Sequence, residues 1–268
     1  TICNGGSTNL SILFTGTGPF TYSINGGGAV VATSNPEIVS VSPSATTTYT
    51  VTSLSGGGCT ALPGDLIGSA VVTVNPRPTA TISGTATICN GSSTNLSILF
   101  TGTAPFMYSI NGGMPVVATT NPEIVSVSPS STTTYTVTSL TDANCSATAG
   151  DLIGSAIVTV NPRPTAVISV NATICNGGST NLSILFTGTA PFIYSINGGA
   201  TAVATTNPEI ISVSPTTTTT YTVTSLTDFN CASIAGDLTG AALVTVNQRP
   251  TAMLSGTTTI CSGLSATL

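Results

Sequence analysis

The sequence of 268 residues contains no histidine, no tryptophan and no lysine, and its only cationic side chains are three arginines. Charged residues make up 4% of the chain, and the formal net charge is -5. Without histidine there is no base for a Ser/His/Asp or Cys/His catalytic arrangement, and without lysine neither a Schiff base nor a P-loop can form. Three cations cannot neutralise a run of phosphates. We therefore predict that this stretch is not an enzyme and that it has no nucleic-acid partner.

Long apolar runs are missing as well. A membrane-spanning helix needs about 18 consecutive apolar residues, and the longest runs here, at 12–14 and 70–72, are far shorter. We expect no membrane insertion in this segment. The chain is nevertheless rich in Val, Ile and Thr, whereas disordered chains are poor in β-branched residues. The composition therefore predicts a folded protein built of strands.

What the sequence does contain is a long internal repeat. TICNGGSTNLSILFTGT begins at Thr1 and recurs, almost unchanged, at Thr87 and Thr173. The period is 86 residues, the size of one small all-β domain. Proline-rich junctions mark the boundaries, and we read the chain as a section of a longer array. The predicted domains are repeat 1 (1–75, without its first strand), repeat 2 (76–161), repeat 3 (162–247) and the start of a fourth repeat (248–268).

Repeat 2 shows the period of two that is typical of half-buried strands. Leu96, Ile98 and Phe100 alternate with polar residues, and Tyr108 lies on the inner face of the next strand. Asn111-Gly112-Gly113 supplies residues that tolerate positive φ at a turn. Short strands at this spacing predict an all-β fold, a tandem array of Ig-like antiparallel β-sandwich domains. The expected strands include 94–100, 124–128, 133–140 and 155–161.

The succession of TICNGGSTNLSI, PFTYSI, SPSATTTYTVTSL, a cysteine and GSAVVTVNPRP resembles the tandem Ig-like and PKD-like repeats of giant Bacteroidota cell-surface adhesins. Many of those proteins resemble type IX secretion substrates, and some are gliding-associated surface proteins. The resemblance covers the whole chain and implies an exported, adhesive or filamentous protein without catalysis. Two features depart from antibody domains: Tyr108 stands in place of the strand C tryptophan, and Tyr135 precedes Cys145 by ten residues.

The cysteines favour disulfides over metal binding. Each complete repeat holds two of them, 56 residues apart, and neither C-x-x-C spacing nor histidine is present. This combination argues against zinc and indicates an oxidising compartment. Pairing within each repeat is the version that we favour, because independently folding repeats are the commoner case. It would join Cys3 to Cys59, Cys89 to Cys145 and Cys175 to Cys231, with Cys261 belonging to the fourth repeat.

A second pairing scheme stays open. In a simple Ig topology the two cysteines of one repeat lie at opposite poles, about 25–30 Å apart, whereas a disulfide needs Cα atoms within about 7 Å. Bonds between neighbouring repeats would avoid that distance and would turn a string of domains into a stapled rod. This rival scheme joins Cys3 to Cys145 and Cys89 to Cys231.

The junctions combine prolines with the arginines of the chain. Proline fixes φ and removes a donor, so we expect these linkers to be extended and stiff. One aspartate per repeat is available to pair with a linker arginine and fix the angle between domains; these are Asp65, Asp151 and Asp237. The inter-domain linker residues are Pro76, Arg77, Pro78, Pro162, Arg163, Pro164, Arg249 and Pro250.

Two further candidate sites have alternatives. Oxygen ligands for calcium are available from Asp142 with Asn144 and from Asp228 with Asn230. Calcium is coordinated by six to eight oxygens, more than these residues supply. The competing interpretation is a turn or capping role. We expect no cofactor. The loops that differ most between repeats include only one exposed aromatic candidate, Phe229.

The leading functional hypothesis is a structural one, the disulfide-stapled shaft of an extracellular surface adhesin or filament on the cell surface. Each repeat would lean on its neighbours in the same chain. Edges with few charges also favour lateral self-association into fibres. The alternative is a module that binds a glycan or surface through its variable loops.

Overall fold

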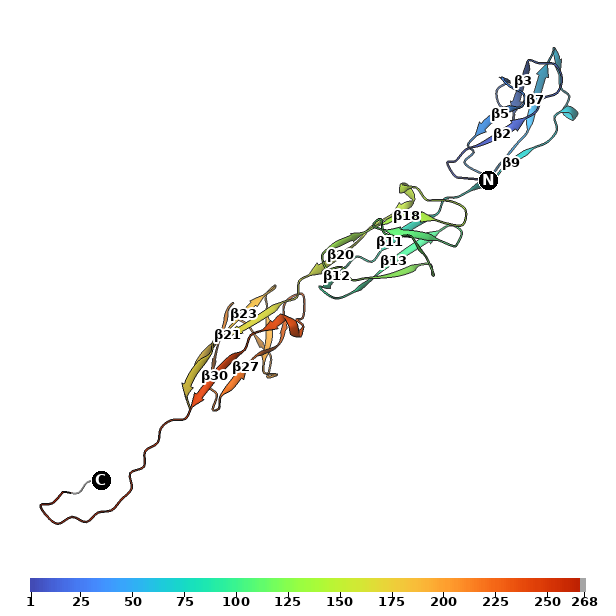
Figure 1. The fold of residues 1–268 in the computed structure, drawn as a ribbon. Coiled ribbons are helices and arrows are strands. Elements are labelled where there is room, and N and C mark those ends of the chain that lie inside the picture. Colours follow the sequence, from blue (N-terminus) through green and yellow to red (C-terminus); the bar gives the residue numbers. More distant parts are fainter. Residues whose placement is uncertain (266–268) are drawn as a thin grey trace. The chain divides into compact units, whose positions relative to one another are not determined.

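The computed structural model describes residues 1–265 (Figure 1), and they form two compact units, Thr1–Thr159 and the chain from Val160 onward. Regular structure consists of short strands and three 3-10 turns. No helix of the described part is long and apolar enough to cross a membrane.

Repeat 2 shows the architecture of one complete domain. One sheet has the strand order β16-β13-β11-β19, and two further sheets have the orders β12-β20-β17 and β15-β14-β18. Only Thr136 separates β17 from β18, so the chain passes directly from one of the latter two sheets into the other and they form one layer. The two layers make an Ig-like β-sandwich. The elements are β11 (Thr79–Ser83), β12 (Ala86–Cys89), β13 (Thr94–Thr101), β14 (Met107–Ile110), β15 (Val116–Val117), β16 (Glu123–Val127), β17 (Thr133–Tyr135), β18 (Val137–Thr141), the 3-10 turn η2 (Ala149–Asp151), β19 (Leu152–Ile153) and β20 (Ala156–Asn161).

Repeat 3 has the same strand orders, β26-β23-β21-β29, β22-β30-β27 and β25-β24-β28. Its elements are β21 (Thr165–Ser169), β22 (Ala172–Cys175), β23 (Thr180–Thr187), β24 (Ile193–Ile196), β25 (Ala202–Val203), β26 (Glu209–Val213), β27 (Thr219–Tyr221), β28 (Val223–Thr227), the 3-10 turn η3 (Ala235–Asp237), β29 (Leu238–Thr239) and β30 (Ala242–Asn247).

Repeat 1 differs from the others at its first strand and at the segments around it. Its β2 pairs with β5 alone, and no described residue occupies the position that β11 takes beside β13 in repeat 2. No strand forms at 66–67, where repeat 2 has β19, and residues 59–60 add a strand beside 51–56. Two short strands, 70–72 and 74–75, stand where repeat 2 has the single strand β20. The strands of repeat 1 otherwise pair as in repeat 2. They are β1 (Ile2–Cys3), β2 (Thr8–Ile12), β3 (Phe20–Ile24), β4 (Val30–Val31), β5 (Glu37–Val41), β6 (Thr47–Tyr49), β7 (Val51–Gly56), β8 (Cys59–Thr60), the 3-10 turn η1 (Pro63–Asp65), β9 (Ala70–Val72) and β10 (Val74–Asn75).

The predicted alternation fills the core. Leu96 and Ile98 are 0% exposed and Phe100 is 3% exposed, because β13 turns every second side chain inward. Tyr108 stacks at a tilt on Phe100, with ring centroids 5.3 Å apart. The outward position before it, Met107, is 46% exposed. The predicted position of Tyr108 on the inner face of its strand is therefore confirmed.

One predicted strand needs correction. The span 133–140 was expected to be continuous, but it is divided at Thr136, where the chain passes from pairing with β20 to pairing with β14. Asn111 holds this break: its side chain donates to the carbonyl of Thr134 at 2.9 Å and accepts from the Thr136 amide at 2.8 Å. Asn111 has a φ of 50° and Gly112 one of 73°, as the Asn-Gly turn requires.

Candidate functional site at the junction of repeats 1 and 2

The junction begins where two strands of repeat 1 end side by side. β1 runs parallel to β10, and Cys3 lies opposite Asn75. The Asn4 amide then donates to the Asn75 carbonyl at 2.9 Å. The chain leaves β10 through Pro76-Arg77-Pro78 and enters β11 of repeat 2. Cys3 is thereby placed at the end of repeat 1 that leads into repeat 2.

A disulfide crosses this junction. Cys3 is bonded to Cys145, with Cα atoms 5.8 Å apart and a sequence separation of 142. Cys145 lies in the loop after β18 of repeat 2, so the bond joins two consecutive repeats. By the chain-entropy estimate, closing a loop of this length stabilises the folded chain by about 5 kcal/mol.

The pairing that we favoured from sequence is wrong. Cys3 is not bonded to Cys59, and Cys145 is not bonded to Cys89. Cys175 is free, so it is not the partner of Cys231. The physical reason is the one that favoured the rival scheme: the two cysteines of a repeat lie at opposite ends of its strands, beyond the reach of a disulfide. Cys89 and Cys231 are each disulfide-bonded, and the free, exposed cysteines are Cys59, Cys175 and Cys261.

Asp142 shapes the loop that carries Cys145. One carboxylate oxygen accepts from the amides of Asn144 and Cys145 at 2.8 and 2.6 Å, and the other accepts from the Thr103 amide at 2.9 Å. Burial alone would raise the pKa of Asp142, but the three amide donors outweigh it and hold the pKa below its usual value. Asp228 of repeat 3 makes the equivalent contacts.

These bonds support the turn interpretation of the two aspartates. Each aspartate accepts from two backbone amides of its own loop and from one amide of the loop after β13 or β23, which fixes the cysteine in place. No group of three or more acidic, cysteine or histidine side chains that suits a metal occurs in the described part of the chain. The candidate oxygens are thus used to position a disulfide.

Arg77 ties the linker to both repeats. Its Nε donates to Asp151 Oδ2 at 2.8 Å, and its Nη1 donates to the carbonyl of Asn4 at 2.8 Å. The bonds from Arg77, together with those from the Thr148 amide and hydroxyl, lower the pKa of Asp151 to about 2. The predicted pairing of a linker arginine with the repeat aspartate is confirmed here. Its contact with Asn4 was not predicted, because no sequence pattern marks a single backbone carbonyl.

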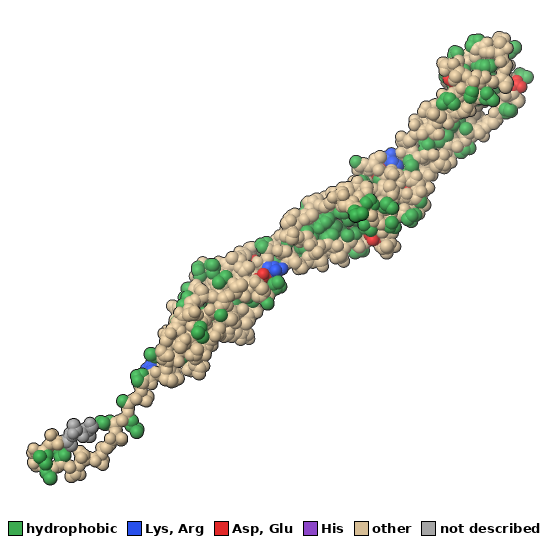
Figure 2. All heavy atoms as spheres, in the orientation of Figure 1, with side chains coloured by type: hydrophobic (Ala, Val, Ile, Leu, Met, Phe, Trp, Pro, Cys, Tyr) green, Lys and Arg blue, Asp and Glu red, His purple; other side chains and the backbone are tan. Residues whose placement is uncertain are grey.

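The other two arginines make contacts that match those of Arg77. Arg163 Nε donates to Asp237 Oδ2 at 2.8 Å, which matches Arg77 with Asp151. Arg249 Nε donates to the carbonyl of Asn176 at 2.7 Å, which matches Arg77 with Asn4. In the view of Figure 2 charged side chains are few and widely spaced.

Pro78 and β11 complete the junction on the side of repeat 2. Pro78 is fully buried, and a side chain at Gly102 would lie 3.1 Å from its Cβ. β11 then pairs antiparallel with β13 and parallel with β19. Ala80 is 0% exposed and Ile82 is 3% exposed, so this strand closes one edge of the core.

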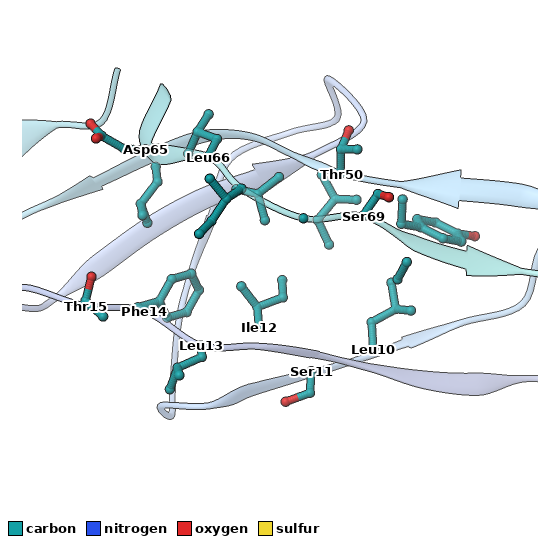
Figure 3. A pocket seen from close by; sticks show the side chains of 17 residues that line it. Leu10, Ser11, Ile12, Leu13, Phe14, Thr15, Thr50, Asp65, Leu66 and Ser69 are labelled. Atoms are coloured by element: carbon teal, nitrogen blue, oxygen red, sulfur yellow. The ribbon is translucent and has the colours of Figure 1, made fainter. Parts of the chain in front are cut away.

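Repeat 1 has an open groove at the place that β11 fills in repeat 2. The groove has a volume of about 520 Å³ and lies between β2 with the residues that follow it and the segment 65–70. Figure 3 shows Leu10, Ile12 and Phe14 pointing into it, toward the segment of Leu66 and Ser69. Leu10 and Ile12 are only half-buried, although their counterparts Leu96 and Ile98 are 0% exposed.

The variable loops are exposed to solvent. Phe229 is 74% exposed and Met114 is 88% exposed. The positions of repeats 1 and 2 that correspond to Phe229 are Gly57 and Ala143, so the exposed aromatic side chain is not a property of the repeat.

No protein-family model matches the chain, and no curated protein matches it. Among solved structures it is similar to a marsupial T cell receptor, at 12% identity over 68% of this chain and 76% of that chain, with a TM-score of 0.26. It is also similar to the N-terminal eight Ig domains of Down Syndrome Cell Adhesion Molecule, at 12% identity and a TM-score of 0.33. That match covers 92% of this chain and 34% of the other. The Ig-like assignment rests on the sheet topology described above.

Proposed function

We propose that the chain is part of the shaft of an extracellular surface adhesin or filament, of the kind that its repeats resemble in giant Bacteroidota cell-surface proteins. The observation that carries this proposal is the disulfide between Cys3 and Cys145, which belongs to two consecutive repeats. A bond that merely stabilised one domain would lie inside it. A bond across a junction restrains how one domain moves against the next, which is what a spacer under tension needs.

The same arrangement is proposed for the next junction. Cys89 stands one period after Cys3, and Cys231 stands one period after Cys145. Asp228 holds the Cys231 amide at 2.6 Å, as Asp142 holds that of Cys145. Both cysteines are disulfide-bonded. We propose that they pair with each other, which would repeat the staple along the chain.

The setting is inferred from the bonds themselves. Disulfides persist in oxidising surroundings, and an Ig-like fold with disulfides is typical of extracellular proteins. The four side chains of each joint, two cysteines, one arginine and one aspartate, account for a large share of the few reactive and charged groups in a repeat. This concentration of cysteine, arginine and aspartate at the junctions fits a structural role, which requires no catalytic group.

The test is mechanical. Single chains held at residues 1 and 268 are stretched by force spectroscopy, with and without a thiol reductant. A stapled shaft predicts a shorter total extension in the oxidised chain, because the residues enclosed by a disulfide are shielded from the force. Cys145→Ser should lengthen the oxidised trace, and Cys59→Ser should leave it unchanged. Equal extensions with and without the reductant would contradict the proposal.

A further inference from the structure

We propose that the Asn4-Gly5 pair at the junction is a modification site, where the asparagine converts to isoaspartate and the carboxylate so formed pairs with Arg77. The inference rests on the turn that follows β1 and on its contact with the linker, and not on where the protein acts. The chain supplies its own comparison, because Asn-Gly occurs six times in it.

The conversion consumes one water and releases one ammonia. The backbone nitrogen of Gly5, after losing its proton to solvent, attacks Asn4 Cγ. The bond from Cγ to Nδ2 breaks, ammonia leaves, and a cyclic succinimide is formed. Water then adds to the backbone carbonyl carbon of Asn4, and the bond from that carbon to the Gly5 nitrogen breaks. The chain now runs through Cγ, and the former backbone carbonyl has become a free carboxylate.

The turn at Asn4 leaves both reacting groups open. The Gly6 amide donates to the Cys3 carbonyl at 2.8 Å, and Gly5 has a φ of 82°. These are the features of a type II turn, whose own hydrogen bond uses neither the Gly5 amide nor the Asn4 carbonyl. Asn4 and Gly5 are both exposed. Among the described residues, no hydrogen bond of the Asn4 side chain or of the Gly5 amide is found. Glycine also lacks a side chain that would shield the attacking nitrogen.

The Asn-Gly turns that follow β3, β14 and β24 are closed to the same reaction. Asn111 Nδ2 donates to the Thr134 carbonyl at 2.9 Å, and Asn111 Oδ1 accepts from the Thr136 amide at 2.8 Å. The Gly112 amide, which holds the nitrogen that would attack, donates to the Thr138 hydroxyl at 2.9 Å. Equivalent contacts hold the two other asparagines of this type, Asn25 and Asn197.

Arg77 lies where the new carboxylate would form. Its Nη1 donates to the Asn4 carbonyl at 2.8 Å, and a side chain at Gly5 would lie 3.1 Å from the same nitrogen. A guanidinium on that carbonyl withdraws electrons from its carbon, so water attacks there and gives isoaspartate rather than aspartate. A charge-assisted bond then replaces a neutral one. Since Arg77 also donates to Asp151, it would hold one carboxylate of each repeat.

The same turn and arginine contact occur in repeat 3. Gly177 has a φ of 85°, and Arg249 Nε donates to the Asn176 carbonyl at 2.7 Å. The side chain of Asn176 differs from that of Asn4, because its Nδ2 donates to Gln248 Oε1 at 3.5 Å. We expect Asn176 to convert more slowly than Asn4 for that reason.

The first test compares the Asn-Gly pairs within the whole oxidised chain. The chain is kept in mildly alkaline buffer, and the mass of each chymotryptic peptide reports the replacement of an amide by an acid. Asn4 should convert about a hundredfold faster than Asn111, because three hydrogen bonds must break first at Asn111. Equal rates at the two positions would overturn the inference.

Two controls assign the difference to the fold. In concentrated urea Asn4 and Asn111 should convert at the same rate, and a difference that persists there would contradict the structural cause. Thr138→Val removes the acceptor of the Gly112 amide. It should raise the rate at Asn111 by about fivefold and leave the rate at Asn4 unchanged. No change at Asn111 would contradict the protection by these contacts.

The second test reads the product and its partner. Electron-transfer fragmentation distinguishes isoaspartate from aspartate at position 4. Arg77→Gln should lower the ratio of isoaspartate to aspartate by about fivefold, since the charged donor is lost.

The pairing is measured on the arginine itself, in a chain with nitrogen-labelled arginine, whose three arginine signals are easily separated. Conversion should slow the solvent exchange of the Arg77 Nη protons by about fivefold, because a carboxylate is a stronger acceptor than a carbonyl. The exchange of the Arg163 protons is the internal control. If either the product ratio or the exchange of Arg77 did not change, the role of Arg77 would be refuted.

Discussion

Repeats 1 and 2 place nearly the same residues in two different surroundings. Both contain the strand TNLSILF, yet Leu96 and Ile98 are fully buried while Leu10 and Ile12 are half-buried. Ala156 is 0% exposed, and its counterpart Ala70 is exposed. The difference is one strand of five residues, β11, which covers the edge of the core in repeat 2. The comparison teaches that the 86-residue unit depends on its first strand to bury its core.

The junction explains why this strand is firmly held. β11 follows directly on a linker in which Pro78 is buried and Arg77 is bonded to both repeats. The disulfide between Cys3 and Cys145 closes the same region from the other side. Joint and first strand thus form one structural unit, and disturbing either should show in the other.

The largest effect is expected from removing the staple. Cys145→Ser should lower the free energy of unfolding by about 5 kcal/mol, since the loop of 142 residues is no longer closed in the unfolded chain. Cys59→Ser, at the same position of repeat 1, should have no effect because Cys59 is free. Chemical denaturation of the two variants measures the difference. Equal losses would show that Cys59 is bonded.

The next effect compares the cost of truncating a core side chain in repeat 2 with the cost in repeat 1. Ile98→Ala should cost about 4 kcal/mol, because Ile98 is completely buried. Ile12→Ala should cost less than about 2 kcal/mol, since its side chain lies in the open groove. Native-state hydrogen exchange of the amides in each repeat reports the two values. Equal costs would mean that the groove of repeat 1 is closed in solution.

The bend that ends the first strand provides a smaller effect. Val170 has a φ of 90°, whereas repeat 2 has Gly84 there with a φ of 114°. A β-branched residue is strained in that region. Val170→Gly should therefore raise the stability of repeat 3 by about 1 kcal/mol. Gly84→Val should lower that of repeat 2 by more, because its Cβ would lie 2.8 Å from the Asn95 carbonyl oxygen. Thermal unfolding followed by exchange measures both, and a destabilising Val170→Gly would refute the strain.

The smallest effect concerns the ion pair of the junction. The pKa of Asp151 is lowered from 3.8 to about 2 by Arg77 and Thr148. The ionised form is therefore favoured in the folded chain. Its contribution to stability is complete above the ordinary pKa and is lost as the pH falls through about 2. In an NMR titration, Arg77→Gln should move the pKa of Asp151 toward its ordinary value and leave that of Asp237 unchanged. A pKa that does not move would assign the shift to Thr148 alone.

Much of the fold follows from the sequence, because alternation and turn residues are local signals. The strand at 94–100, the buried Tyr108 and the turn at Asn111 are confirmed on that basis. The break at Thr136 was missed, since it depends on which neighbouring strand each half pairs with. That is a property of the folded sheet and leaves no mark in the alternation.

The joint was predicted only in part. The pairing of Arg77 with Asp151 followed from their recurrence once per repeat, and it is confirmed. The favoured disulfides were wrong because we assumed, from the regular repeat, that each domain forms its disulfide within itself. The distance expected between the two cysteines of one repeat, at opposite ends of the sandwich, already argued against that pairing. The groove of repeat 1 could not be predicted from the sequence. Its lining residues are nearly the same as in repeat 2, and it is open only because no described strand covers the edge of the sheet.

The central claim is that Cys3 is bonded to Cys145 across the junction. A peptide map of the unreduced chain tests it most directly, with chymotrypsin as the protease because each of the three arginines is followed by proline. The account predicts one linked pair of peptides that contains Cys3 and Cys145 and that separates on reduction. A linked pair that contains Cys3 and Cys59 would contradict it.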